Sequence, residues 1–178
     1  MMYETEAKIR VNGSREAVVT WFTSIGFQYV DSCYEEDVYY THPCRDFAET
    51  DEALRFRYRR CSSGDAYILT YKGPRVNEGF IKTRLELETR LEESQVKSVL
   101  RMLEMLGFTG KFVVRKNRVT LRNGGLTVSV DEVEDLGVFV EVEGKGIEPL
   151  LREVALTPWF GGFVGKTYLE LMLEKSKV

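Results

Sequence analysis

The stretch Y-E-T-E-A-K-I-R-V, residues 3–11, decides how the rest of this chain is interpreted. In an extended strand, successive side chains point to opposite faces, so Glu4, Glu6, Lys8 and Arg10 share one wholly ionic face. Two carboxylates about 7 Å apart on one face raise each other's pKa unless a cation lies between them. The stretch therefore fits either a divalent metal shared by Glu4 and Glu6, with Lys8 holding an anion beside it, or the polar outer face of an ordinary strand, which is the commoner case.

The composition limits the class of protein. The chain of 178 residues carries 25 basic and 28 acidic side chains, and a near balance of charge argues against a general nucleic-acid binder. Its length fits one domain over residues 1–178, and no apolar run approaches the length of a membrane span. Three cysteines without a C-x-x-C pair make a disulfide framework or a zinc knuckle unexpected. We therefore expect a soluble, cytoplasmic globular protein.

Charged alternation recurs along the chain. Residues 53–60, A-L-R-F-R-Y-R-R, place Arg55 and Arg57 on one face, and residues 80–88 form a second ladder of two bases and two acids. Further strands are predicted around residues 37–41, 66–72, 111–121, 126–131 and 138–143, mostly in antiparallel meanders. Helical spacing predicts helices over residues 14–26, 92–106, 147–156 and 165–175, with an aromatic loop over residues 158–163. The chain thus contains about eight strands, with helices after the first and the fifth.

The ionic faces must turn away from the helices. Amphipathic helices must bury their apolar stripes against another apolar surface. The only such surfaces in this sequence are the strand faces formed by Ile, Leu, Val and Phe. Two arrangements remain, an open sheet with its ionic face in solvent or a closed barrel with an ionic lumen. Solvent-exposed strand faces usually include Ser, Thr, Asn and Gln beside the charged residues. The polar faces of these strands consist almost entirely of charged residues. We therefore predict an α+β fold, a closed eight-stranded antiparallel β-barrel with a charged lumen and flanking helices.

A lumen of this kind must bind an ionic ligand, because enclosing so many charges costs many kcal/mol unless they are neutralised. The candidate inward bases are Lys8, Arg55, Arg57, Lys72, Arg84, Lys116 and Arg118, and the candidate inward acids are Glu4, Glu6, Glu86, Glu88, Asp131, Glu141 and Glu143. Arginine forks bind phosphate oxygens in pairs, and clustered carboxylates without His or Cys suit Mg²⁺ or Mn²⁺. A metal-bound polyphosphate would satisfy both groups.

At this point several segments together carry a resemblance. The motif E-T-E-A-K at residues 4–8 resembles the E-x-E-x-K signature of the CYTH superfamily, the triphosphate tunnel metalloenzymes, which include class IV adenylyl cyclases and thiamine triphosphatases. The similarity extends through L-R-F-R, Y-K-G-P, R-L-E-L-E, K-N-R, Asp131, E-V-E and K-T-Y-L-E-L, in that order along nearly the whole chain.

The resemblance implies a triphosphate lying inside an eight-stranded tunnel, and it implies a role for each matching residue. The metal ions would be held by Glu4, Glu6, Asp131, Glu141 and Glu143. The phosphates would be held by Lys8, Arg55, Arg57, Lys72, Arg84, Lys116, Arg118 and Lys166. The catalytic residues would be Lys8, Glu6 and Glu143, whereas Glu86 and Glu88 match family acids with no clear role.

Two reactions fit such a tunnel. Water attacking the terminal phosphoryl group makes the protein a triphosphatase, whereas a ribose 3′-hydroxyl attacking the α-phosphorus of ATP makes it an adenylyl cyclase that releases pyrophosphate. We place hydrolysis of an inorganic or organic triphosphate (tripolyphosphate, ATP or thiamine triphosphate) slightly ahead of cyclisation. The cyclase stays close behind, because the chain length and the layout of residues 92–118 resemble class IV cyclases. The acidic neighbours of Lys8 oppose its use as a base, so water with a metal-lowered pKa is the expected nucleophile of hydrolysis. The non-enzymatic alternative is a polyphosphate or nucleotide sensor. An exposed strand edge or the aromatic loop could support a homodimer.

Three other signals carry less weight. G-G-F-V-G-K-T at residues 161–167 lacks the first glycine of a P-loop, since Phe160 stands there, so Lys166 is interpreted as a cation that opens the last helix. His42 precedes Pro43 and is interpreted as structural. Trp159, Phe160 and Phe163 could contact a nucleobase or thiamine ring, but packing at the end of the barrel is favoured.

Overall fold

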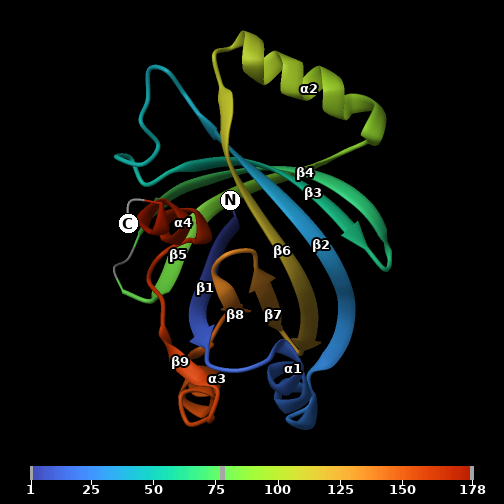
Figure 1. The fold of residues 1–178 in the computed structure, drawn as a ribbon, viewed down its shortest axis with the longest axis vertical. Helices are drawn as coiled ribbons and strands as arrows, with labels where there is room; N and C mark the ends of the chain where they lie inside the picture. Colours follow the sequence, from blue (N-terminus) through green and yellow to red (C-terminus); the bar gives the residue numbers. More distant parts are fainter. Residues whose placement is uncertain (1, 77–78, 177–178) are drawn as a thin grey trace.

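The computed structural model describes residues 2–76 and 79–176, and within them it contains nine strands and four helices (Figure 1). The strands are β1 (Met2–Val11), β2 (Gln28–Thr41), β3 (Ala53–Cys61), β4 (Gly64–Arg75), β5 (Ile81–Leu91), β6 (Thr109–Asn123), β7 (Leu126–Val133), β8 (Gly137–Glu143) and β9 (Phe160–Phe163). The helices are α1 (Arg15–Ser24), α2 (Glu93–Met105), α3 (Glu148–Val154) and α4 (Tyr168–Lys175). None of these helices is long and apolar enough to cross a membrane.

Eight strands close into an antiparallel barrel. The sheet order is β5-β4-β3-β2-β6-β7-β8-β1-β9, and β1 also pairs with β5, which joins the two sides of the sheet. In this register Glu6 lies opposite Glu143 on one neighbouring strand and Lys82 on the other. Closure places one row of charged side chains from each of β1, β3, β4, β5, β6 and β8 on the inside. The predicted α+β fold with a closed eight-stranded barrel is confirmed.

β9 is an addition to this barrel, in a segment predicted to be a loop. It pairs with the end of β1, where Ile9 lies opposite Phe163. Gly161 permits this approach, because a Cβ atom there would lie 2.8 Å from the main-chain oxygen of Arg10. Gly-rich sequence is more often loop than strand, which is why the pattern gave no sign of it.

The apolar core lies on the outer face of the barrel, under α1 and α3 at one end (Figure 1). α1 begins where the Ser14 hydroxyl caps the Ala17 N–H at 3.2 Å, and it buries Val18 and Phe22 completely. Trp159 packs edge-on against Trp21, with ring centroids 5.6 Å apart. Trp159 thus belongs to this core, and Phe160 and Phe163 of β9 pack against it, which agrees with the packing role favoured for these aromatic residues.

α2 does not pack as predicted. None of its residues is buried, and Met102 and Met105 are 61% and 70% exposed. Figure 1 shows why, since α2 lies beyond one end of the barrel, between the end of β5 and the start of β6. The expectation that every amphipathic helix covers a strand face is wrong here. A capping box of Glu92 and Gln95 satisfies backbone groups at the start of this helix.

A second correction concerns the cysteines. Cys33 of β2 and Cys61 of β3 lie opposite each other and form a disulfide, and Cys44 remains free and exposed. The odd cysteine count made such a bond unexpected. The count was a poor guide, because one pair needs only two cysteines in register on neighbouring strands.

Candidate active site

A cavity of about 980 Å³ fills the lumen of the barrel. The predicted site residues that line it are Glu4, Glu6, Lys8, Arg55, Arg57, Lys72, Arg84, Glu86, Glu88, Lys116, Arg118, Glu141 and Glu143. They come from six different strands, so only closure of the barrel brings them together. The structure therefore assembles nearly all of the residues that the sequence placed on ionic faces.

Carboxylates gather on one side of the cavity, around Glu4. Burial, together with the charges of Glu86 and Glu143, raises the pKa of Glu4 to about 7. Burial and the neighbouring Glu6 likewise raise the pKa of Glu143. Such crowded carboxylates repel each other until protons or a cation neutralise them. Their oxygens fit a hard divalent cation such as Mg²⁺ or Mn²⁺.

Glu6 stays ionised in the same group. Burial and Glu141 push its pKa upward, but Lys8, Lys72 and Lys82 outweigh them, and the pKa is lowered. A carboxyl group must be deprotonated to hold a metal. Glu6 is therefore the member of the group best prepared to act as a ligand.

Lys8 is a fixed cation. Its side chain is 4% exposed, and its Nζ donates to Oε1 of Glu141 at 2.5 Å and lies 3.9 Å from the centroid of the Tyr168 ring. Burial lowers its pKa, but Glu141 and Glu6 outweigh burial and raise it. A charged ammonium binds anions and cannot remove a proton, which supports an anion-binding role for Lys8.

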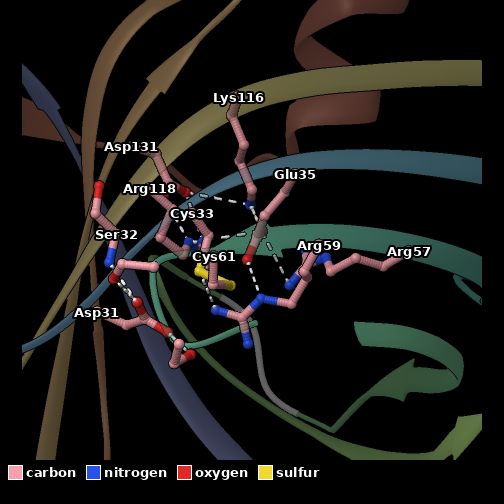
Figure 2. Close-up of a disulfide and its surroundings, with 12 residues drawn as sticks. Asp31, Ser32, Cys33, Glu35, Arg57, Arg59, Cys61, Lys116, Arg118 and Asp131 are labelled. Carbon is pink, nitrogen blue, oxygen red and sulfur yellow. Dashed lines mark hydrogen bonds and ion pairs between the residues drawn. A yellow bond between two sulfur atoms is a disulfide. The ribbon is translucent and has the colours of Figure 1, made fainter. Parts of the chain in front are cut away.

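Cations gather beside these acids and are held by two carboxylates that the sequence analysis missed. Asp37 accepts from Nε and Nη2 of Arg57 at 2.5 and 2.8 Å. Glu35 lies 2.8 Å from Arg59, 3.2 Å from Arg57 and 3.5 Å from Lys116 (Figure 2). Burial raises the pKa of Glu35, but Arg57 and its other basic neighbours outweigh it and lower the pKa to about 2. These buried acids hold the cations in place, as period-two spacing from residue 33 would have indicated.

Asp131 does not line the cavity. Its carboxylate is completely buried, and it accepts from Nε of Arg118 at 2.6 Å and from the hydroxyl of Tyr168 at 2.9 Å. It also lies 3.3 Å from Lys116. With its oxygens engaged in this way, Asp131 orients two bases and a tyrosine, whereas the sequence predicted a metal ligand.

Lys166 also lies apart from the cavity. Its side chain is 52% exposed and forms an ion pair with Glu174 on the outside of α4. The same helix instead directs Tyr168 inward, where its ring lies against Lys8 and Lys116. The alternation of side chains along a strand cannot distinguish Lys166 from Tyr168, because these residues lie at the start of a helix.

The two acids of unclear role have different surroundings. Glu86 accepts from Nζ of Lys72 at 2.5 Å and contributes to the raised pKa of Glu4, so it belongs to the carboxylate group. Glu88 accepts from the hydroxyl of Thr70 at 3.4 Å, and that hydroxyl also accepts from Arg55 at 3.1 Å.

Lys82 was placed on an ionic face but not among the predicted site residues. It is 1% exposed, and within residues 2–76 and 79–176 its Nζ has no hydrogen-bond partner. Burial, followed by the charge of Lys8, lowers its pKa to about 8. It adds positive charge behind Glu6.

The raised pKa of Glu4 predicts an unusual pH dependence of stability. A carboxyl whose pKa is raised in the folded state stabilises the protein while protonated, and this contribution is lost as pH rises from about 4.5 to about 7. A Glu4→Gln variant should therefore match the wild type in melting temperature near pH 5 and exceed it at pH 8 without divalent metal. Thermal scans with EDTA test this, and Mg²⁺ at pH 8 should stabilise only the wild type substantially. Parallel pH curves for the two proteins would contradict the assignment.

Comparisons with known proteins agree with this geometry. A sequence profile of the CYTH domain matches residues 2–155. A Methanocaldococcus jannaschii protein named "Putative adenylate cyclase MJ0240" is 32% identical over 180 residues, which cover 96% of this chain and 98% of that protein. The PH1819 protein of Pyrococcus horikoshii OT3 is 37% identical, with a TM-score of 0.84 over 97% of this chain and 99% of its own.

A more distant structure, HpAC1 from Hippeastrum, shares the fold. It is 16% identical, with a TM-score of 0.72 over 97% of this chain and 96% of its own, and it is described as having a dominant triphosphatase activity. The profile match and the 32% identity to the M. jannaschii protein extend over most of the sequence that builds the charged lumen. This chain belongs to the CYTH domain family.

Proposed function

We propose that the protein is a divalent-metal-dependent enzyme that hydrolyses the terminal phosphoryl group of a triphosphate inside the barrel. The observation that carries this proposal is the lumen itself, where crowded carboxylates around Glu4 and Glu6 share one enclosed cavity with the cations around Arg57. A cavity lined only by carboxylates would bind a metal ion, and a cavity lined only by cations would bind an anion. A metal-loaded chain of phosphates fits both.

The carboxylates of Glu4, Glu6 and Glu143 would hold the cation, since their chemistry fits Mg²⁺ or Mn²⁺. When bound, such a cation supplies Lewis acidity toward phosphoryl oxygens and lowers the pKa of water. Glu141 is already engaged by Lys8 and Arg118, so it would join this set only by exchanging those contacts.

The bases of the lumen would bind and orient the phosphates. Arg55, Arg57 and Arg84 offer planar forks for pairs of phosphate oxygens, and Lys8 and Lys72 offer point charges. The buried acids Glu35 and Asp37 keep the Arg57 fork fixed before substrate arrives, and fixed cations stabilise the charge that develops on the transferred group. In hydrolysis, a water oxygen bonds to the terminal phosphorus while the bond to the bridging oxygen breaks, and orthophosphate and a diphosphate leave.

Cyclisation of ATP is the second candidate, and the M. jannaschii relative named as an adenylate cyclase favours it. In that reaction the ribose 3′-oxygen bonds to the α-phosphorus and pyrophosphate leaves. It needs a group that takes the hydroxyl proton, and the raised pKa of Lys8 argues against that residue.

A product assay separates the candidates. The purified protein is incubated with Mg²⁺ or Mn²⁺ and, separately, with tripolyphosphate, thiamine triphosphate and ATP, and the products are resolved by ion-exchange chromatography. Orthophosphate supports the triphosphatase, and cyclic AMP with pyrophosphate supports the cyclase. Tight binding without any product would leave a triphosphate sensor and contradict the enzyme proposal.

A further inference from the structure

The Cys33–Cys61 disulfide faces the lumen. Along β2, Cys33 shares its face with Glu35 and Asp37, two positions apart each time, and all three are buried. Along β3, Cys61 likewise shares its face with Arg59 and the other inward bases. The bond therefore lies next to the row of charges that lines the cavity, and Figure 2 shows it beside Glu35, Arg59 and Arg118.

The sulfur of Cys33 is connected to the phosphate-binding cations by direct contacts. Nη2 of Arg59 lies 3.3 Å from Sγ of Cys33, and Nε of the same guanidinium lies 2.8 Å from Glu35. Glu35 in turn pairs with Arg57 at 3.2 Å and with Lys116 at 3.5 Å. A change of charge at the sulfur thus acts on a guanidinium that itself lines the cavity.

The two sulfurs differ in access. Cys33 is 3% exposed, whereas Cys61 is only partly buried at the start of the turn between β3 and β4. Disulfide exchange requires a thiolate to reach one of the two sulfurs. The turn at Cys61 gives a small reductant that access.

We propose that Cys33 and Cys61 form a reversible redox modification site whose reduction weakens triphosphate binding in the lumen; this rests on the function proposed above. A dithiol reductant attacks Sγ of Cys61 and forms a mixed disulfide, while Cys33 leaves as a thiolate. The second sulfur of the reductant then displaces Cys61. The protein gains two electrons and one proton, as a thiol at Cys61 and a thiolate at Cys33 beside Arg59, while the second proton goes to solvent and the reductant leaves as a cyclic disulfide.

Reduction weakens binding in two ways. The guanidinium of Arg59 balances the charge of a Cys33 thiolate, so less of its positive charge is available to a phosphate. Reduction also removes the covalent tie between Cys33, within β2, and Cys61, at the end of β3, which loosens the contacts of Arg59 and Glu35. Loss of one charge-assisted contact corresponds to about a tenfold rise in Kd.

The experiment combines a thiol count with calorimetry. Protein oxidised with glutathione disulfide is denatured and titrated with a thiol reagent, and it should show one thiol per chain, from Cys44, and three after dithiothreitol. Titration of the native protein with tripolyphosphate in Mg²⁺ should give a Kd about tenfold higher after reduction. The reduced protein should also melt roughly 10 °C lower.

Two variants control this test. C44S changes the one cysteine outside the pair and should keep the full redox response. The C33S/C61S double variant should bind tripolyphosphate with an affinity that dithiothreitol does not alter. Equal Kd values for oxidised and reduced wild type, or three thiols after oxidation, would overturn the redox proposal. If neither form binds tripolyphosphate, the proposed function fails, and the thiol count with the melting shift still decides whether the redox pair exists.

Discussion

A Glu6→Gln variant will lose roughly a thousandfold of the metal-dependent triphosphate turnover, equivalent to about 4 kcal/mol of transition-state stabilisation. Glu6 is the acid whose pKa is held low by Lys8, Lys72 and Lys82, against its own burial and Glu141. The amide keeps the shape of the side chain but removes its charge. The loss should therefore come through the metal.

Metal affinity provides the measurement that separates this cause from misfolding. Binding of Mn²⁺, followed by electron paramagnetic resonance, should weaken in parallel with turnover, while the circular dichroism spectrum without metal keeps the shape of the wild-type spectrum. Glu132→Gln is the matched control, because Glu132 lies on the outside of β7 with its side chain 54% exposed. A Glu6→Gln protein that binds Mn²⁺ like the wild type would contradict the metal assignment.

Strand alternation predicted the barrel because several strands have one face rich in charged residues and one apolar face, as in residues 3–11 and in β5. The limits of that pattern appear at α2 and β9. α2 has an apolar stripe that meets no strand, since helical periodicity describes the helix and carries no information on where the chain directs it. β9 forms through a main-chain approach that glycine permits, and this leaves no periodic signal.

The sequence predicted a site residue correctly where the strand face that carries its side chain was enough to place it in the lumen. Arg55, Arg57 and Glu141 line the cavity as their alternation indicated. The strand face of Asp131 could not show that its carboxylate is enclosed by Arg118 and Tyr168. That arrangement depends on the side chain of Tyr168, which comes from α4. A carboxylate that binds a ligand and one that only holds neighbouring side chains are both Asp or Glu in the sequence. Only their hydrogen-bond and ion-pair partners in the structure distinguish them.

Asp37 shows how much stability depends on such structural carboxylates. An Asp37→Asn variant should lose about 3–5 kcal/mol of free energy of unfolding, because it leaves the buried guanidinium of Arg57 without its two-point partner. Equilibrium denaturation in urea measures this loss. Asp65→Asn is the control, since Asp65 is exposed and accepts a hydrogen bond only from Tyr58 among the described residues.

The pH dependence gives this prediction its sign. Burial raises the pKa of Asp37, but Arg57 and Arg55 outweigh it and hold the pKa well below its ordinary value of 3.8. A carboxyl with a lowered pKa stabilises the fold above that ordinary value, and this contribution is lost as pH falls further. The difference between wild type and Asp37→Asn should thus be full at pH 7 and should narrow as pH falls below about 4. A difference independent of pH would mean that the aspartate contributes shape alone, and the cations of the lumen would then be held in place by other contacts.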